Sequence, residues 1–390
     1  MWSWFLASRV LCLLLLVPES GVLSDLEYFG RALGAEGLAR ALPEYPWPVV
    51  ALLAAPLQAG ITVGFPYFLA LIAAFLAVDA AFAWQLWRAA GRRMSVGLGL
   101  WIALGPLLGP LVLTRFDALT AILAAGGIAL APSRPALAGS FNALGCGIKL
   151  WPAIAFPALL VPGDARARLR AVAAATTTGL ALAAATVLAA GAERLWSPFA
   201  FQAQRGLQVE AFAALPLLWA RHVDAAFTWT TSLGACRCWE ITGPGVDLVL
   251  QGAAGGLLVG LAALALLHVR AFLAPPAART IGLALRLMVV TLIVWIATNK
   301  VFSPQYLLWL AAPLALLGAL PGEKLQHADT ALFVAACLLT HLVFPLQYSS
   351  LTDPNPSKAW VLTTLSLRDL ALFALGARLA HQAWRASARA

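Results

Sequence analysis

The sequence predicts an all-α fold, a polytopic transmembrane helical bundle of about 12 spans, and two observations support it. Hydrophobic residues make up 62% of the 390 residues and charged residues only 11%, whereas a soluble domain usually carries about a quarter charged residues. Apolar runs near 20 residues long recur from one end of the chain to the other, which is the length that crosses a bilayer as a helix. We therefore expect a single integral-membrane domain over residues 1–390.

The apolar runs place the expected spans along the chain. They lie at 2–17, 65–87, 94–113, 117–131, 135–148, 150–162, 171–190, 246–268, 280–298, 302–319, 329–346 and 360–380. Arg9 falls inside the first run, and we expect its long side chain to reach the cytoplasmic edge. The first run also fits a cleaved signal peptide, because its apolar stretch after Arg9 is short.

The basic residues set the expected orientation. The net charge is +9, but the basic residues lie in short clusters between apolar runs, which indicates no nucleic-acid partner. By the positive-inside rule the cytoplasmic segments are 88–93, 133–135, 163–170, 268–279, 321–324 and the C-terminal tail. The alternate loops then face outward, and most of the acidic residues lie with them.

Two of the outward loops are long, residues 18–64 and 191–245. Each contains an apolar stretch too short to cross the bilayer, residues 47–58 in the first and 209–220 in the second. Such stretches are typical of helices that lie in the membrane interface or dip into it. We expect interfacial helices in both loops.

Charged and polar side chains gather on the predicted outer side, beginning with Asp25 and Glu27 in SDLEYF. A charged group near hydrocarbon costs a few kcal/mol on insertion scales, so a set of them at one face needs a reason. Carboxylates, cations and aromatic rings together suit one task, holding an anionic lipid-linked substrate while a carboxylate removes a proton. The other members of the set are Glu44, Tyr45, Arg115, Asp117, Lys149, Arg205, Glu210 and Lys300.

Structural interpretations of these residues remain open. Ser24 or Asp25 fits the N-cap of a helix over SDLEYFGRALGAEGLARAL, and Lys149 and Lys300 fit anchors at the membrane edge. Arg115 and Asp117, two residues apart, do not face each other on a helix. The tryptophans near the expected interface fit an aromatic belt; they are Trp47, Trp151, Trp196, Trp239 and Trp309.

Charged residues inside the expected spans fit pairs within the bundle, and the cysteines have no metal-ligand spacing. The charged residues are Asp79, Arg286, Arg368 and Asp369. Cys236 and Cys238, in GACRCWE, are close enough in sequence to be oxidised in an extracytoplasmic loop, although a disulfide between them is strained. We expect no tightly bound metal and no cofactor.

At these residues the sequence resembles the GT-C class of integral-membrane glycosyltransferases, and more narrowly the bacterial family 87 mannosyltransferases that use polyprenyl-phosphate sugars. The matching pieces are DLEYF, EYPWP, RFDALTAILAAGGIALAPSRPALAG, GIKLWPAIAFPALL, QRGLQVE and KVFSPQYLLWLAAPLALL. They are scattered over residues 24–318, and their shared order is more specific than any one of them. EYPWP departs from the family's Tyr-Pro-Pro stretch by an inserted Trp47.

The resemblance implies an activity and a place for it. A hexose, most often mannose, moves from a polyprenyl-phosphate donor to a lipid or glycan acceptor outside a bacterial plasma membrane, with inversion. The catalytic residues implied are Asp25, as the base, and Glu27. Charge on the departing phosphate must be neutralised, for which Lys149, Arg205 and Lys300 are the candidates. Substrate-binding candidates are Tyr28, Glu44, Tyr45, Arg115, Asp117, Glu210, Gln305 and Tyr306.

Two other functions remain open from the sequence. A membrane transporter or lipid flippase of the cell envelope predicts inverted repeats and ionisable groups near the bilayer midplane. A non-catalytic membrane subunit of an envelope-assembly complex predicts no intact catalytic site. In every case membrane lipids are partners.

Overall fold

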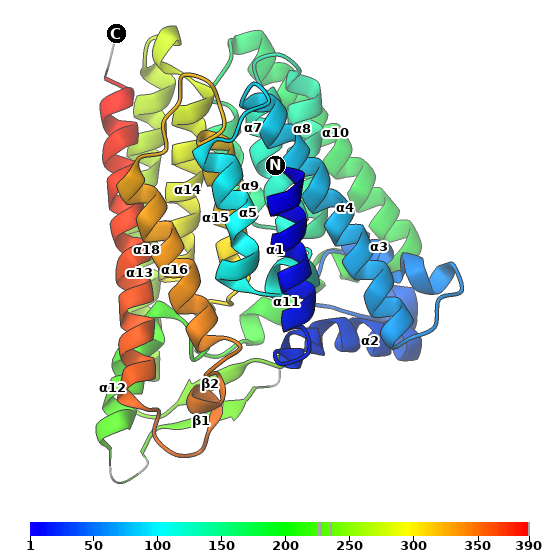
Figure 1. The fold of residues 1–390 in the computed structure, drawn as a ribbon, viewed down its shortest axis with the longest axis vertical. Coiled ribbons are helices and arrows are strands. Elements are labelled where there is room, and N and C mark those ends of the chain that lie inside the picture. Colours follow the sequence, from blue (N-terminus) through cyan, green and yellow to red (C-terminus); the bar gives the residue numbers. More distant parts are fainter. Residues whose placement is uncertain (225, 227, 235, 389–390) are drawn as a thin grey trace.

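The computed structural model describes all residues except 225, 227, 235, 389 and 390, and it is almost entirely helical (Figure 1). The α-helices are α1 (Trp2–Leu15), α2 (Ser24–Arg40), α3 (Trp47–Gln58), α4 (Phe65–Ala89), α5 (Val96–Leu108), α6 (Leu111–Thr114), α7 (Asp117–Leu130), α8 (Pro135–Ile148), α9 (Pro152–Leu159), α10 (Ala165–Ala190), α11 (Ser197–Gln204), α12 (Leu215–Val223), α13 (Val246–Leu273), α14 (Ile281–Thr298), α15 (Tyr306–Leu317), α16 (His327–Val343), α17 (Ser349–Thr352) and α18 (Ala359–Ala386).

Short elements complete the described chain. A two-stranded antiparallel hairpin pairs β1 (Thr230–Leu233) with β2 (Trp239–Thr242). The 3₁₀ turns are η1 (Ser20–Leu23), η2 (Ala192–Leu195), η3 (Phe212–Ala214) and η4 (Pro276–Ala278). The apolar stretch at 47–58 forms helix α3 with the expected bounds, and the stretch at 209–220 is helical only from Phe212 onward.

Five described helices are long and apolar enough to span a membrane, namely α4, α10, α13, α14 and α18. A sixth span results if α1 and the segment Ser20–Arg40, which bend by 93° at their junction, count as one. The expected count of about 12 spans is therefore not confirmed. The other apolar helices end sooner than a full crossing requires, because prolines and glycines such as Gly109 and Pro110 interrupt the runs.

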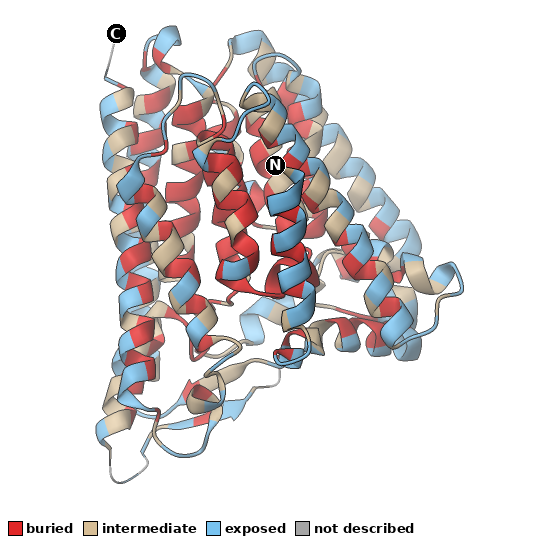
Figure 2. Cartoon of the chain, in the orientation of Figure 1, coloured by how far each residue is buried: buried red, intermediate tan, exposed pale blue. Residues whose placement is uncertain are grey.

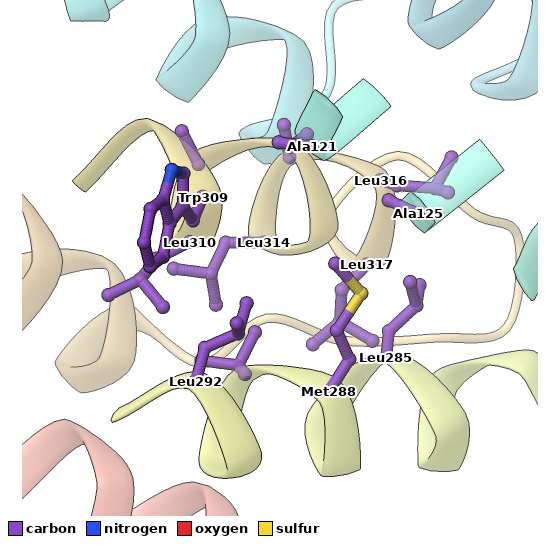
Figure 3. Close-up of a cluster of buried hydrophobic side chains, with 14 of the residues drawn as sticks. Ala121, Ala125, Leu285, Met288, Leu292, Trp309, Leu310, Leu314, Leu316 and Leu317 are labelled. Atoms are coloured by element: carbon purple, nitrogen blue, oxygen red, sulfur yellow. The ribbon is translucent and has the colours of Figure 1, made fainter. Parts of the chain in front are cut away.

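The centre of the bundle is α15, in which every residue from Tyr306 to Leu317 is buried. Figure 3 shows its side chains packed between α7 and α14, with Leu310, Leu314 and Leu317 against Leu285, Met288 and Leu292. A helix that is hydrophobic on all sides fits only an interior position. Because protein surrounds α15, it needs no lipid-spanning length of its own.

The rim of the bundle exposes apolar surface instead. In α10 only 11% of the best membrane-spanning window is buried, and in α13 only 22%. Figure 2 shows α10 almost entirely in the exposed and intermediate colours, in contrast to the buried centre. Exposed side chains such as Leu188 and Leu258 are ordinary in a lipid-facing helix and costly in water. The exposed apolar surface of α10 and α13 therefore indicates that these helices face lipid.

Two glycines allow the helices to approach closely. A Cβ on Gly97 of α5 would lie 1.8 Å from the carbonyl oxygen of Ala315 in α15, and one on Gly139 of α8 would lie 1.9 Å from that of Ala171 in α10. Small residues at such contacts are the usual means of tight helix packing in membranes. Larger side chains at these two positions would push the helices apart.

Arg9 does not reach the membrane edge, contrary to the expectation from its position. Its side chain is only 2% exposed, and its Nε lies 2.7 Å from Asp79 Oδ2 in α4. Trp101 of α5 donates its indole N–H to the same carboxylate at 2.7 Å. The other in-span charges also have partners within the bundle: Arg286 pairs with Glu323, and Arg368 with Asp369.

The two ends of the bundle differ in content. One end, the loop-rich end, carries α2, α11, α12 and the β1–β2 hairpin, and it is the lower end in Figure 1. The other, the basic end, carries the last turns of α18 and the start of α14. At the basic end Asp164 and Thr280 accept backbone N–H bonds as N-caps of α10 and α14.

Candidate active site

Polar side chains from five separate segments meet at the loop-rich end. The segments are the start of α2, the α6–α7 junction, the end of α8, the chain around α11, and the loop before α15. Helix ends leave backbone groups and polar side chains unpaired by the helix itself. Charge therefore collects where several helices begin or end together.

Asp25 lies in the first turn of α2 and faces Arg115 at the α6–α7 junction. Its Oδ2 is 3.1 Å from Arg115 Nε, with Asp25 33% exposed and Arg115 5%. This contact is an ion pair without hydrogen-bond alignment, because the Nε–H has no acceptor. Arg115 Nη1 instead donates to the carbonyl oxygens of Val22 at 2.8 Å and Thr114 at 3.3 Å.

The capping interpretation of Asp25 is wrong. Helix α2 begins at Ser24, the N-cap residue is Leu23, and no side chain within the described residues caps the helix. Asp25 Oδ1 has no hydrogen-bond partner in the described part of the chain, and the carboxylate is partly exposed. One carboxylate oxygen thus remains free to accept a proton or a hydroxyl group.

Glu27 points elsewhere, although it is only two residues from Asp25. It pairs with Arg31 one turn later in α2, at 2.9 Å, and both side chains are more than half exposed. Residues two apart lie on opposite sides of a helix. The two carboxylates therefore do not act on one point in this structure.

Asp117 and Lys149 form a second ion pair, and this one is buried. Lys149 Nζ lies 2.6 Å from Asp117 Oδ1, and the indole N–H of Trp309 donates to the same oxygen at 2.6 Å. Asp117 begins α7 and Lys149 follows the last residue of α8. A carboxylate at a helix N-terminus is favoured by the helix dipole.

Aromatic rings enclose the lysine. Its ammonium group lies 5.2 Å from the ring centre of Phe116, 5.7 Å from Trp309 and 5.9 Å from Tyr45, distances at which cation–π attraction operates. The ring of Tyr306 stacks on that of Trp309 with a centroid distance of 3.8 Å, and the ring of Trp151 also stacks on Trp309, at 5.3 Å.

Trp151 and Trp309 therefore do not belong to a membrane-interface belt. They are 6% and 4% exposed, and they build a wall of the polar cluster. An indole buried with its N–H bonded to a carboxylate is a structural part of a site. The position of Trp309 within an apolar run hid this role in the sequence.

Tyr45 links the two ion pairs. Its ring lies 5.2 Å from Phe116. Burial raises the pKa of Tyr45, and the negative charges of Asp25, Glu44 and Asp117 raise it further. The protonated form of the Tyr45 hydroxyl is therefore favoured.

Glu44 adds a half-buried carboxyl group beside cations from the second long loop. Tyr28 donates its hydroxyl to Glu44 Oε2 at 3.3 Å. Burial raises the pKa of Glu44, while its hydrogen bonds and the charges of Arg205 and Arg194 partly offset the rise. Arg194 is held by the carbonyl oxygens of Ala41 and Leu42.

Arg205, in the second long loop, and Lys300, in the loop before α15, differ in how they are bound. Lys300 Nζ donates to the carbonyl oxygens of Ala203, at 3.2 Å, and Arg205, so it ties the loop before α15 to the end of α11. Arg205 forms no salt bridge among the described residues, and its Nε is buried without an acceptor. Arg205 is thus available to a ligand, and Lys300 holds its backbone.

The remaining candidates lie at the margin. Glu210 is fully buried and pairs with Arg368 of α18 at 3.0 Å, which points to packing. Gln305 precedes α15 as its N-cap residue and is half-buried. Arg237, which the sequence did not single out, lies 4.4 Å over the ring of Tyr28. Cys236 and Cys238 are free thiols.

Taken together, these groups can perform one kind of chemistry. A carboxylate with a free oxygen can accept a proton, an unpaired guanidinium can neutralise an anionic group, and stacked aromatic rings can hold an apolar face. Within the described residues, no three His, Cys, Asp or Glu side chains gather as a metal site.

Comparison with known proteins identifies the family. The model of glycosyltransferase family 87 matches residues 45–270, more than half of the chain. The matched range includes Asp117, Lys149 and Arg205, and it begins after Asp25. No curated protein and no solved structure matches the chain. With its apolar helices and this match, the chain belongs to glycosyltransferase family 87 and is a membrane glycosyltransferase.

Proposed function

We propose that the protein transfers a hexose, mannose in the first instance, from a polyprenyl-phosphate donor to a lipid or glycan acceptor. The transfer takes place at the extracytoplasmic face of a bacterial plasma membrane and inverts the anomeric configuration. Asp25 is the base. The observation that carries this proposal is the Asp25 carboxylate, which is held beside Arg115 with one oxygen free.

The proposed reaction is a single displacement. The acceptor hydroxyl oxygen attacks the anomeric carbon, and the bond from that carbon to the donor's phosphate oxygen breaks. The phosphate keeps the bonding electrons and leaves as an anion, while the hydroxyl proton passes to Asp25. A sugar hydroxyl has a high pKa, so the carboxylate accepts the proton only as the new bond forms.

Arg205 is the first candidate for the donor phosphate, because it has no carboxylate partner among the described residues. Lys149 is the second, although Asp117 shares its charge. Lys300 supports the site indirectly by holding the Arg205 carbonyl. Preorganised cations aimed at developing negative charge are a large source of rate enhancement.

The aromatic wall forms the apolar backing of the proposed sugar site. Tyr306, Trp309 and Trp151 stack on one another beside Lys149, and each is at most 9% exposed. A lipid-linked donor reaches such a site sideways from the bilayer, so that the exposed apolar rim and the polar end serve the same substrate. A mixed apolar and anionic donor fits this site better than a free ion does.

The sidedness follows from charge. The segments rich in arginine lie at the basic end, which the positive-inside rule assigns to the cytoplasm. Cysteine placed at the exposed Ser24, in a chain whose five native cysteines are replaced, should react with an impermeant reagent added outside. Cysteine at the exposed Ser133 should not react. The reverse pattern would place the site in the cytoplasm.

The activity is tested with membranes that contain the full chain. They are incubated with radiolabelled polyprenyl-phosphate mannose or, in parallel, with a labelled nucleotide mannose in the absence of free polyprenyl phosphate. Label should pass into lipid or glycan only from the first donor. Transfer from the nucleotide sugar alone would overturn the donor assignment. A third incubation uses radiolabelled polyprenyl-phosphate glucose, and transfer from that lipid but not from polyprenyl-phosphate mannose would overturn the sugar assignment.

A further inference from the structure

A polar pocket lies at the basic end of the bundle, which is the opposite end from the candidate active site. Its volume is about 720 Å³. It opens between the start of α14, the segment between α15 and α16, and the last turns of α18, at the end of the molecule where Figure 1 marks the C-terminus. The pocket lies at the start of α14 and Lys300 follows its end, so the length of this 18-residue helix, roughly 27 Å, separates them.

The charged lining of this pocket is mainly basic. The charged and titratable side chains are Arg286, Glu323, Lys324, Arg378, His381 and Arg385. Two of the arginines have carboxylate partners: Arg286 Nη1 lies 3.0 Å from Glu323, and Arg378 Nε lies 2.7 Å from Asp329. The two charges within each pair cancel. The remaining basic side chains of the lining have no carboxylate to balance them among the described residues.

A hydrogen-bond network fixes the floor of the pocket. Gln382 donates to Asp329 Oδ2 at 2.7 Å and accepts from Arg286 Nε at 3.3 Å. Arg286 also donates to the carbonyl oxygen of Lys324 at 3.0 Å. Because this last bond holds the backbone of residue 324, the lysine side chain starts from a fixed position at the rim.

Three basic side chains at the rim have no such partner. Within the part of the chain that the structure describes, Lys324, His381 and Arg385 form no salt bridge, and all three are exposed. His381 and Arg385 are four residues apart on α18, so that they share one face of the helix. The positive charges of Lys324 and Arg385 therefore have no carboxylate partner among the described residues, and an anion between them would supply one.

We propose that this pocket binds a phosphate group, carried either by the headgroup of an anionic phospholipid or by a soluble phosphate ester. Lys324 and Arg385 supply the fixed charge, and the network around Arg286 and Gln382 holds the backbone of Lys324 in place. Basic pockets between transmembrane helices on the cytoplasmic side are typical anionic headgroup sites. The site is distinct from the proposed donor site and does not require that proposal to be correct.

The surface next to the pocket suits a lipid. Leu273, at the end of α13, is 81% exposed, and Trp384 on α18 is 42% exposed. Trp384 also lies under the guanidinium of Arg270 at 4.1 Å. Apolar side chains beside a basic pocket would contact the acyl chains while the phosphate sits among the cations.

Native mass spectrometry of the full chain in neutral detergent tests the proposal. The probes are dioleoyl phosphatidylglycerol, dioleoyl phosphatidylcholine and glycerol 3-phosphate. The wild-type chain should retain phosphatidylglycerol over phosphatidylcholine. The double variant Lys324→Gln/Arg385→Gln should lose roughly tenfold or more of that affinity, since two charged hydrogen bonds are removed.

A matched double variant separates a site from general attraction. Arg93→Gln/Arg166→Gln removes the same charge from exposed positions at the same end, outside the pocket, and should bind phosphatidylglycerol as the wild type does. Competition by glycerol 3-phosphate at similar concentration would assign the site to a soluble ester, and its absence to the lipid. Equal losses of affinity in the two double variants would overturn the proposal. So would a wild type that prefers neither of the two anionic probes, phosphatidylglycerol and glycerol 3-phosphate, over phosphatidylcholine.

Discussion

Asp25 and Arg115 stand 3.1 Å apart as an ion pair that is not a hydrogen bond. The arginine donates its hydrogen bonds to two carbonyl oxygens, those of Val22 and Thr114. It therefore joins the turn before α2 to the α6–α7 junction, and in doing so sets where Asp25 stands. We therefore expect Arg115 to act as a positioning residue, whose loss should change the rate more than substrate binding.

Replacing Arg115 should misplace the carboxylate. For Arg115→Gln we expect kcat to fall by about a hundredfold with little change in KM, since a displacement of about 1 Å can cost that much. Arg31→Gln removes the partner of Glu27 on the same helix and should leave both constants near their wild-type values. Equal effects of the two variants on kcat would remove the special role of Arg115.

Arg205 and Lys300 should rank by their freedom to bind a ligand. Arg205→Gln should raise the KM for the donor by roughly ten- to a hundredfold, as expected for a lost charged hydrogen bond. Arg205→Lys should restore part of the affinity. Arg40→Gln, an exposed cation at the end of α2, is the matched control and should leave that KM unchanged.

Lys300→Gln tests a different role, because the ammonium group of Lys300 holds backbone carbonyls. We expect a lower Tm and a smaller rise in the donor KM than for Arg205→Gln. The two readouts are a melting curve and donor saturation in the same detergent. A larger donor effect at Lys300 than at Arg205 would reverse the proposed order.

The helical fold was predictable from the sequence because hydropathy has a long and redundant signal. The bounds of α3 and the start of α2 follow from single residues such as Pro48 and Ser24. The number of spans was not predictable to the same degree. An interior helix such as α15 is as apolar as a span but only 12 residues long, so hydropathy does not distinguish the two. The β1–β2 hairpin, in a loop with little hydropathy contrast, also gave no usable signal.

The charged residues of the candidate site could be singled out from the sequence, but their pairings could not. Asp25, Asp117, Lys149 and Arg205 stood out because charge is scarce in this chain. Their partners could not be read, because Asp25 meets a residue 90 positions away and Asp117 is bonded by Trp309, 192 positions away. Trp309 lies in an apolar run, where nothing in the local pattern distinguishes a packed indole from one at the membrane edge.

Glu44 should make stability depend on pH. Burial raises its pKa in the folded protein, so folding disfavours the ionised form. The resulting penalty is absent below the pKa of the unfolded chain and grows as the pH rises through the folded-state pKa. Glu44→Gln should therefore raise the Tm at pH 8 and have little effect at pH 4. A Tm difference of the same size at both values would contradict the assignment.

The Arg9–Asp79 pair should matter for stability and not for turnover. Asp79→Asn leaves a buried guanidinium without its counter-charge, which typically costs about 3–5 kcal/mol. The double variant Arg9→Met/Asp79→Asn should recover much of the loss, as measured by Tm in detergent. Its turnover per folded molecule should match the wild type. Failure of the double variant to recover any stability would show that the pair is not the cause.

The catalytic assignment of Asp25 is tested most directly by the initial rate of sugar transfer in Asp25→Asn, measured beside Glu27→Gln. Asparagine keeps the shape of the side chain, but its amide cannot accept the proton, and no capping bond is lost because Asp25 makes none. The rate should fall by roughly a hundred- to ten-thousandfold, with donor binding retained, while Glu27→Gln stays within a few-fold of the wild type. Transfer by Asp25→Asn at close to the wild-type rate would contradict the assignment of Asp25 as the base.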